Sequence, residues 1–493
     1  MPRHAPTDHR IAPLLLLLAL LTWGCGGTSD GDDPAGIRRE GDLLVGGSSG
    51  LVLSIPQDLP AEVTLEELTA VYEALEATPP CRTSVPGEAV DLVLAQGCLR
   101  YQRLYLYPEL LPRSLDGFST LADYVAELRL TDPFTSLFAA SVFQDAVQPA
   151  LTGSRATIGL RLRISDGAPS ISDATPLTVT EVLPFTRAWY DGFQVEDRIV
   201  EVHRPPGVVH ASVRGLTLDQ ALELLPREEA EEAQITVDRG GQLVVVATAA
   251  EVHLAFLLQP DVAYFSVRRY TTQTGQRVRD DYLALSQEAG AAPGKIILDL
   301  RGNGGGSVTG ALDLTDYLVD HDEPPNTHPI LTFDGTLLQN ASRYLGQFAA
   351  NLPGVTPESF VVLVDGDTAS ASEITAAALR DYGVATLVGT VTFGKGVRQD
   401  VVTLLDGSGL FITSHFILPP SRVSYHGIGI DPDFVVEATV AEGTITQARD
   451  PQLEAAVALL LGSTPVSEAP RAQRAQVPRT PTGDPWTRFL GTQ

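Results

Sequence analysis

The sequence predicts an α/β protein whose main core is preceded by a helical module and a β-rich domain. From Val262 onward, apolar runs typical of buried strands alternate with stretches of helical spacing, and this alternation favours an α/β layer structure. Between residues 155 and 250, short alternating segments bounded by turn residues predict a small β-rich domain. Between residues 55 and 150, apolar residues at helical spacing predict a helical N-terminal module.

Length and composition set the broad class. The 493 residues exceed what one hydrophobic core usually organises, so several domains are expected. With 44% hydrophobic and 19% charged residues, most of the chain should fold. The formal charge of −27, from 34 basic and 61 acidic residues, argues against a nucleic-acid partner because phosphate binding needs a basic face.

Two helices are predicted in the N-terminal module. The first covers residues 64–77, where Thr64 and Glu67 form a candidate capping box. The second runs from Leu121 to Leu128, and Pro133 ends the helical pattern that follows it.

The β-rich domain is predicted from alternation and turns. Residues 177–182 and 198–202 alternate apolar and polar side chains as half-buried strands do, and residues 218–225 have helical spacing. Residues 238–241 predict the turn of a closing hairpin.

The core, placed at residues 255–440, has four predicted strands and two predicted helices. The strands are 262–267, 295–300, 359–364 and 385–389, and the helices are 307–319 and 374–382. Residues 463–493 lack periodicity and predict a loose tail.

The N-terminus is typical of an exported protein. Basic residues precede an apolar run, residues 11–23, which is too short to span a membrane stably. The run ends at Cys25, so residues 1–25 resemble a bacterial lipoprotein signal that makes Cys25 the lipidated first residue, with residues 26–54 as a tether. Gly26 after the cysteine favours the outer membrane, on the periplasmic side. The alternative is a cleaved secretory signal in which Cys25 has no role.

Two further cysteines, Cys81 and Cys98, remain in a compartment that permits disulfides. The sequence leaves two alternatives: a disulfide between them, or two buried free thiols. Cysteine and histidine do not cluster as metal ligands, so no metal site is predicted.

A glycine-rich loop follows the apolar strand that ends near Leu300. Gly304, Gly305 and Gly306 would let backbone N–H groups approach a bound oxygen closely, as in an oxyanion hole. The loop lacks the lysine and hydroxyl residue of a phosphate loop and the spacing of a dinucleotide fingerprint. A tight turn without function is the alternative.

Ser370 stands between an apolar strand and a predicted helix. At a helix N-terminus, free N–H groups and the positive end of the dipole would stabilise an oxyanion formed beside this serine. Most serines at such positions are N-caps, which is the alternative.

Lys395 lies between two glycines and is one of two lysines in the chain, the other being Lys295. A desolvated lysine can lose its proton near neutral pH, whereas arginine stays protonated. A solvated turn lysine is the alternative reading for both.

Together these three segments resemble the C-terminal processing, or tail-specific, proteases, which are Ser-Lys serine peptidases. In that family the nucleophilic serine lies 25 residues before the lysine, which is the spacing between Ser370 and Lys395. The resemblance makes Ser370 the nucleophile, Lys395 the general base and Gln399 the residue that orients the lysine. It makes the N–H groups of Ala371 and Gly305 the oxyanion donors, although Gly304 replaces the usual proline and leaves the donor glycine open.

The same resemblance extends from Ile158 to about Val436. It implies a core of the ClpP/crotonase type, a PDZ domain at residues 155–250, and capture of a substrate's C-terminal tail at Ile158, Gly159 and Leu160. No metal or organic cofactor is implied. Residues 132–134 are similar to the lead-in of lipoprotein members.

The function expected from these residues is endopeptidase cleavage of exported proteins with extended C-terminal tails. One rival is a Ser-His-Asp hydrolase using His415 or His426 and Asp431, although the chain lacks the G-x-S-x-G elbow. Another is a peptide-binding adaptor lipoprotein whose peptidase core is degenerate. The physiological substrate and the oligomeric state stay open.

Overall fold

The computed structural model describes most of the chain between residues 38 and 462. The described residues are 38–40, 42–45, 51–56, 60, 63–78, 81–84, 88–147, 158–164, 168–204, 210–226, 231–250, 253–319, 329–334, 342–345, 359–438, 446 and 449–462. Cys25, the signal, most of the tether and the tail of residues 463–493 therefore lie outside the described residues.

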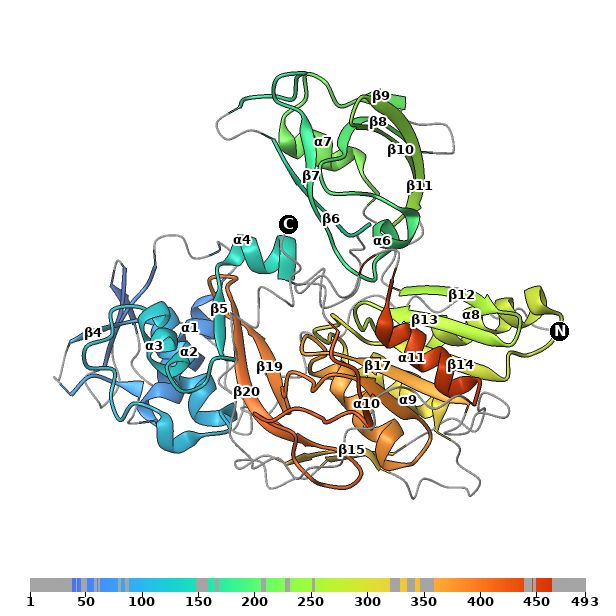
Figure 1. Cartoon of the computed structure of the whole chain (residues 1–493). Coiled ribbons are helices and arrows are strands. Elements are labelled where there is room, and N and C mark those ends of the chain that lie inside the picture. Colours follow the sequence, from blue (N-terminus) through green and yellow to red (C-terminus); the bar gives the residue numbers. More distant parts are fainter. Residues whose placement is uncertain are drawn as a thin grey trace, which may run out of the picture.

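The N-terminal module combines helices with a small sheet (Figure 1). Its helices are α1 (Leu65–Glu76), α2 (Leu92–Leu104) and α3 (Leu121–Arg129). The capping box of Thr64 and Glu67 is confirmed: the Thr64 side chain accepts from the Glu67 N–H at 3.2 Å. Cys81 and Cys98 are joined by a disulfide.

The prediction of a helical module was incomplete, and the prediction of residues 26–54 as a tether was wrong where three strands lie in that range. Four three-residue strands form a sheet in the order β1 (Arg38–Glu40), β2 (Leu43–Val45), β3 (Val52–Ser54) and β4 (Ala89–Asp91). Three residues are too few to produce a recognisable alternation, so the sequence carried no signal for them. The short helix η2 (Pro108–Leu110) lies between α2 and α3, and the module ends in β5 (Ser136–Phe138), α4 (Ala140–Val142) and η3 (Phe143–Val147).

A β-rich unit, residues 158–250, follows. Its strands are β6 (Leu160–Arg163), β7 (Leu177–Val182), β8 (Arg198–His203), β9 (His210–Ser212), β10 (Glu232–Arg239) and β11 (Gln242–Ala249), and its helices are α6 (Arg187–Asp191) and α7 (Leu218–Leu224). The sheet order is β11-β10-β8-β7-β6, with β9 beside β8. Among the described strands, β6 therefore lies at an edge of the sheet and pairs on one side only.

The core is a six-stranded sheet with helices on both faces. Its order is β12 (His253–Gln259), β13 (Val262–Val267), β14 (Lys295–Asp299), β17 (Phe360–Val364), β18 (Thr386–Gly389) and β21 (Phe434–Val435). All neighbours are parallel except β12 and β13. The parallel strands are mostly apolar because both of their faces are covered.

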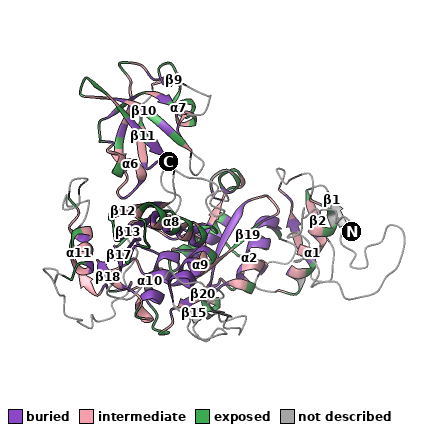
Figure 2. Ribbon diagram, turned by 90° about the vertical axis from the view of Figure 1, so that its right-hand side faces the viewer, coloured by how far each residue is buried: buried purple, intermediate pink, exposed green. Residues whose placement is uncertain are grey.

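Alternate residues of these strands meet different helices. One face packs against α8 (Thr274–Ala289), α9 (Val308–Leu318) and α10 (Ala371–Asp381), and the other packs against α11 (Pro451–Leu460). Leu298 and Val362 belong to the first face, while Ile297 and Val361 belong to the second. Figure 2 shows the buried residues gathered in these central strands and in α9 and α10.

A second sheet joins the core to the N-terminal module. Its order is β16 (Ser342–Leu345), β15 (Pro329–Asp334), β20 (Gly409–Leu418) and β19 (Val397–Thr403), and β5 of the N-terminal module also pairs with β20. Leu410 and Ile412 of β20 lie in the hydrophobic cluster of the N-terminal module. The module and the core therefore share β20, as the contact between the blue and orange parts of Figure 1 shows. Within the described residues, no helix combines the length and apolar character needed to cross a membrane.

Candidate active site

Ser370 lies where the chain turns sharply from β17 into α10. Its backbone adopts φ 57° and ψ −115°, a left-handed conformation that non-glycine residues rarely take. Such conformations persist only where the surroundings hold them, and they concentrate at functional sites. The N–H of Ser370 donates to Oε2 of Glu373 at 2.9 Å.

Glu373 links the backbone of Ser370 to that of Lys395. It has no exposed surface, and its Oε2 also accepts from the N–H of Lys395 at 2.8 Å. Its Oε1 accepts from the Thr392 hydroxyl at 2.5 Å and from the Gly394 N–H at 2.7 Å. Burial raises the pKa of Glu373 to about 7, while these four donors act in the opposite direction.

The role of Glu373 was missed in the sequence, although a signal was present. A glutamate three residues after a serine at a helix start is the capping-box pattern, which Thr64 and Glu67 also show. Here the same pattern places a buried carboxylate between the two predicted catalytic residues.

Lys395 precedes β19, and its side chain is partly buried. Its Nζ donates at 2.6 Å to Oε1 of Gln399, the residue that the family resemblance assigned to orienting the lysine. The same Nζ lies 5.4 Å from the centre of the Phe134 ring. Burial lowers the pKa of Lys395 to about 8, and the carboxylates of Asp132 and Glu373 oppose this shift. By contrast, Lys295 begins β14 and pairs with Asp261.

Gln399 connects the lysine to the N-terminal module, because its Nε2 donates to the Phe134 carbonyl oxygen. Phe134 lies 265 residues earlier in the chain. The sequence predicted that a helical pattern ends at residues 132–134, which are similar to the lead-in of lipoprotein members, but it did not predict this contact. Hydrogen bonds between such distant segments leave no periodic signal.

The glycine loop lies directly against Ser370. A Cβ atom on Gly305 would come within 2.8 Å of the Ser370 Cβ, 3.0 Å of the Ala369 carbonyl oxygen and 3.1 Å of the Ala371 nitrogen. Gly305 also has φ 108°, so this position requires glycine on two counts. Its lack of a side chain keeps the space in front of the Ala371 N–H open.

Asn303 holds this loop to the start of α10. Its carbonyl oxygen accepts from the Ala369 N–H at 2.9 Å and from the Ser372 hydroxyl at 3.0 Å. Its Oδ1 accepts from the Gly305 N–H at 2.9 Å. The Gly305 N–H, which was predicted as an oxyanion donor, is therefore already hydrogen-bonded to the Asn303 side chain.

The predicted tail-binding residues belong to the β-rich unit. Ile158 is buried, and its carbonyl oxygen accepts from the Ala188 N–H at 2.8 Å. Gly159 has φ 89° and its carbonyl oxygen accepts from the Leu183 N–H at 2.8 Å. Leu160 begins the edge strand β6.

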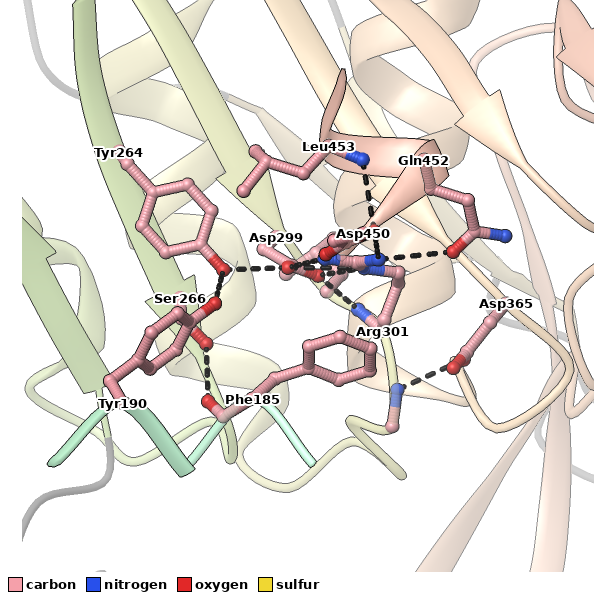
Figure 3. A network of polar contacts seen from close by, with 12 residues as sticks. Phe185, Tyr190, Tyr264, Ser266, Asp299, Arg301, Asp365, Asp450, Gln452 and Leu453 are labelled. Atoms are coloured by element: carbon pink, nitrogen blue, oxygen red, sulfur yellow. Dashed lines mark hydrogen bonds and ion pairs between the residues drawn. The ribbon is translucent and has the colours of Figure 1, made fainter. Parts of the chain in front are cut away.

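A buried polar network connects this unit to the core beside the glycine loop (Figure 3). Arg301, with no exposed surface, pairs with Asp299 and Asp450, and its guanidinium lies 3.9 Å from the centre of the Phe185 ring. The Tyr190 hydroxyl lies 2.6 Å from that of Tyr264. Phe185 of the β-rich unit thus contacts Arg301, which precedes the loop at Gly302, whereas Tyr190 contacts Tyr264 of β13.

His426 does not form the alternative triad. The His426 ring packs against Phe134 at 5.8 Å, and its Nδ1 is buried without a hydrogen-bond partner in the described part of the chain. No described carboxylate therefore orients this nitrogen, as a Ser-His-Asp triad would require. Burial also lowers the pKa of His426. Among the described residues, no group of three or more histidine, cysteine or acidic side chains could hold a metal.

Known proteins resemble this chain over the same region. The model of peptidase family S41 matches residues 261–436. The carboxyl-terminal-processing protease of Synechocystis sp. is 30% identical over 352 residues, which cover 69% of this chain and 76% of that protein. The chloroplastic C-terminal processing peptidase of Tetradesmus obliquus is 27% identical over 404 residues, covering 78% and 80%.

A solved structure, of a photosystem II D1 C-terminal processing protease, has 23% identity and a TM-score of 0.41 and covers 70% of this chain and 92% of that one. The sequence relatives and the family match agree on one class of enzyme. The chain is a serine peptidase and belongs to peptidase family S41, the carboxyl-terminal-processing proteases.

Proposed function

We propose that the chain is a Ser-Lys endopeptidase, with Ser370 as nucleophile and Lys395 as general base. The observation that carries this proposal is the Glu373 carboxylate, which binds the backbone N–H of both residues through one oxygen. The lowered pKa of Lys395, about 8, supports it further because an appreciable fraction of the lysine is then neutral near physiological pH.

The proposed reaction proceeds through an acyl-enzyme. Neutral Lys395 takes the proton of the Ser370 hydroxyl as its oxygen attacks a peptide carbonyl, and the resulting ammonium returns a proton to the leaving amine. Water activated by the same lysine then hydrolyses the ester. Gln399 orients Lys395 through its 2.6 Å hydrogen bond.

The developing oxyanion would be bound at the start of α10. The Ala371 N–H supplies one donor, favoured by the positive end of the helix dipole. The second donor comes from the loop of Gly304 to Gly306, and the Gly305 N–H serves only when it leaves Oδ1 of Asn303.

The proposed substrates are exported proteins with extended C-terminal tails. In this proposal the core is of the ClpP/crotonase type, and the β-rich unit is a PDZ domain that adds the tail as a strand to the open edge of β6, with the carboxylate near Ile158, Gly159 and Leu160. Lipidation of Cys25 would anchor the enzyme on the periplasmic side of a bacterial membrane.

The test compares Ser370→Ala, Lys395→Ala and Lys295→Ala. Because Lys295 is the chain's other lysine and pairs with Asp261, it is a matched control. Cleavage of an unfolded, tail-bearing protein, followed by mass spectrometry, should fall about a thousandfold in the first two variants and stay unchanged in the third. Full cleavage by Lys395→Ala would overturn the Ser-Lys assignment. Failure of a fluorophosphonate to label Ser370, with peptide binding intact, would instead indicate a degenerate adaptor.

A further inference from the structure

A buried turn of the N-terminal module reaches the catalytic base. It consists of Asp132, Pro133 and Phe134, which follow α3 and precede β5. The Asp132 N–H donates to the Leu128 carbonyl at 2.9 Å, and Oδ1 of Asp132 accepts from the Phe134 N–H at 3.1 Å. The Asp132 side chain therefore fixes the backbone at Phe134.

Phe134 contacts the base in two ways. Its carbonyl oxygen accepts from Nε2 of Gln399, whose Oε1 in turn accepts from Nζ of Lys395. Its ring lies 5.4 Å from the same Nζ and packs against Phe393 at 6.4 Å. A continuous chain of hydrogen bonds thus runs from Asp132 through Phe134 and Gln399 to Lys395.

The Asp132 carboxylate is itself enclosed. Asp132 is 3% exposed, and the hydroxyls of Tyr105 and Thr413 lie beside its carboxylate. Among the described residues, Oδ2 of Asp132 has no hydrogen-bond partner, and the hydroxyls of Tyr105 and Thr413 have none either. Burial raises the pKa of Asp132, and the positive charge of Lys395 opposes this. A carboxylate kept in such a place needs a cation nearby to offset its desolvation.

We infer that Asp132 is a positioning residue for the catalytic base: it fixes Phe134, which holds Gln399 against Lys395, and its negative charge acts on the lysine ammonium. This inference rests on the proposed Ser-Lys mechanism. It adds a second residue of the N-terminal module, beside Phe134, to a site built mainly from the core.

Three titratable side chains act on Lys395 from the elements around it. Asp132 faces it from the N-terminal module, Glu373 from α10, and His426 from the loop after β20. The two carboxylates favour the ammonium form, whereas a charged His426 would disfavour it. Tyr101, Tyr105 and Tyr107 face Asp132 in turn, and the pKa of each is raised. Removing the Asp132 charge therefore makes Lys395 easier to deprotonate.

The test follows the rate at which a fluorophosphonate labels Ser370 in the full chain between pH 6 and 10. In the wild type this rate should rise with pH through about 8, since the neutral lysine is the active form. Asp132→Asn keeps the acceptor for the Phe134 N–H but loses the charge, so the midpoint should move down by roughly one pH unit. Asp132→Ala loses both, so its rate at the high-pH plateau should also fall roughly tenfold.

Two controls distinguish the loss of the role of Asp132 from a folding defect and from a failure of the proposed Ser-Lys mechanism. Asp116→Asn removes an exposed carboxylate of the same module and should leave midpoint and plateau unchanged, and thermal unfolding is followed for every variant. An unmoved midpoint in Asp132→Asn, together with a wild-type plateau in Asp132→Ala, would overturn the role of Asp132. Undiminished labelling of Lys395→Ala would overturn the mechanism instead.

Discussion

At the scale of single residues, the site depends on one buried carboxylate. Glu373 receives four donors on two oxygens, and two of those donors belong to Ser370 and Lys395. The strained backbone of Ser370 is held in part by this contact. Neither the shared carboxylate nor the strained backbone could be deduced from the serine and the lysine considered separately. Taken alone, a serine at a helix start is most often an N-cap, and a lysine between glycines is most often a solvated turn residue.

Glu373→Gln should harm both stability and catalysis. A glutamine offers one acceptor oxygen and brings an NH₂ group toward N–H groups, so at least one buried donor loses its partner at a cost of about 1–3 kcal/mol. We expect a lower free energy of unfolding in urea and a kcat reduced more than tenfold. Glu67→Gln is the matched control, because a capping box accepts either residue. Wild-type stability and kcat in Glu373→Gln would refute this role.

At the scale of elements, long periodic segments were predicted well. The helices α1, α3 and α9 and the strands β13, β14, β17 and β18 lie within a few residues of their predicted positions. The start of α10 was placed three residues late, because Ala371, Ser372 and Glu373 lack helical periodicity although they are buried. Strands β1 to β5 are only three residues long, and their pairing is decided by tertiary contacts.

The glycine loop gives a sharp prediction at this scale. Gly305→Ala would place a methyl group against Ser370 and in front of the Ala371 N–H, so kcat for peptide cleavage should fall about a hundredfold or more. Gly290→Ala is the matched control, since Gly290 also has a positive φ of 73° but nothing within 4 Å of its added Cβ. If both variants lost the same activity, backbone strain rather than blockage of the site would be responsible.

At the scale of the whole molecule, both neighbouring units contact residues at or beside the proposed active site of the core. The N-terminal module shares β20 and supplies Phe134, while the β-rich unit places Phe185 over Arg301 beside the glycine loop. The sequence indicated these units but not these contacts. Pairs such as Phe185 and Arg301 have no fixed spacing, so only the folded chain brings them together.

Phe185→Ala tests the contact between the β-rich unit and the core. Loss of the ring over a desolvated guanidinium costs about 2 kcal/mol, and the segment leading to Gly302 loses its support. We expect kcat/KM for a tail-bearing protein to fall roughly tenfold. Val245→Ala changes an exposed residue of the same unit and should have no effect. Equal kcat/KM in Phe185→Ala and the wild type would show that the contact is not coupled to catalysis.

The pairing of β5 with β20 also has a consequence for biosynthesis. Phe134 leaves the ribosome 265 residues before Gln399, an interval of roughly a quarter of a minute or longer at ordinary rates of synthesis. Until β19 and β20 follow, the carbonyl of Phe134 has no glutamine to bind and the lysine has no orienting partner. On the proposed mechanism, a chain that is still being synthesised cannot yet cleave neighbouring proteins. Its catalytic base is complete only when the N-terminal module has bound the β19 segment of the core.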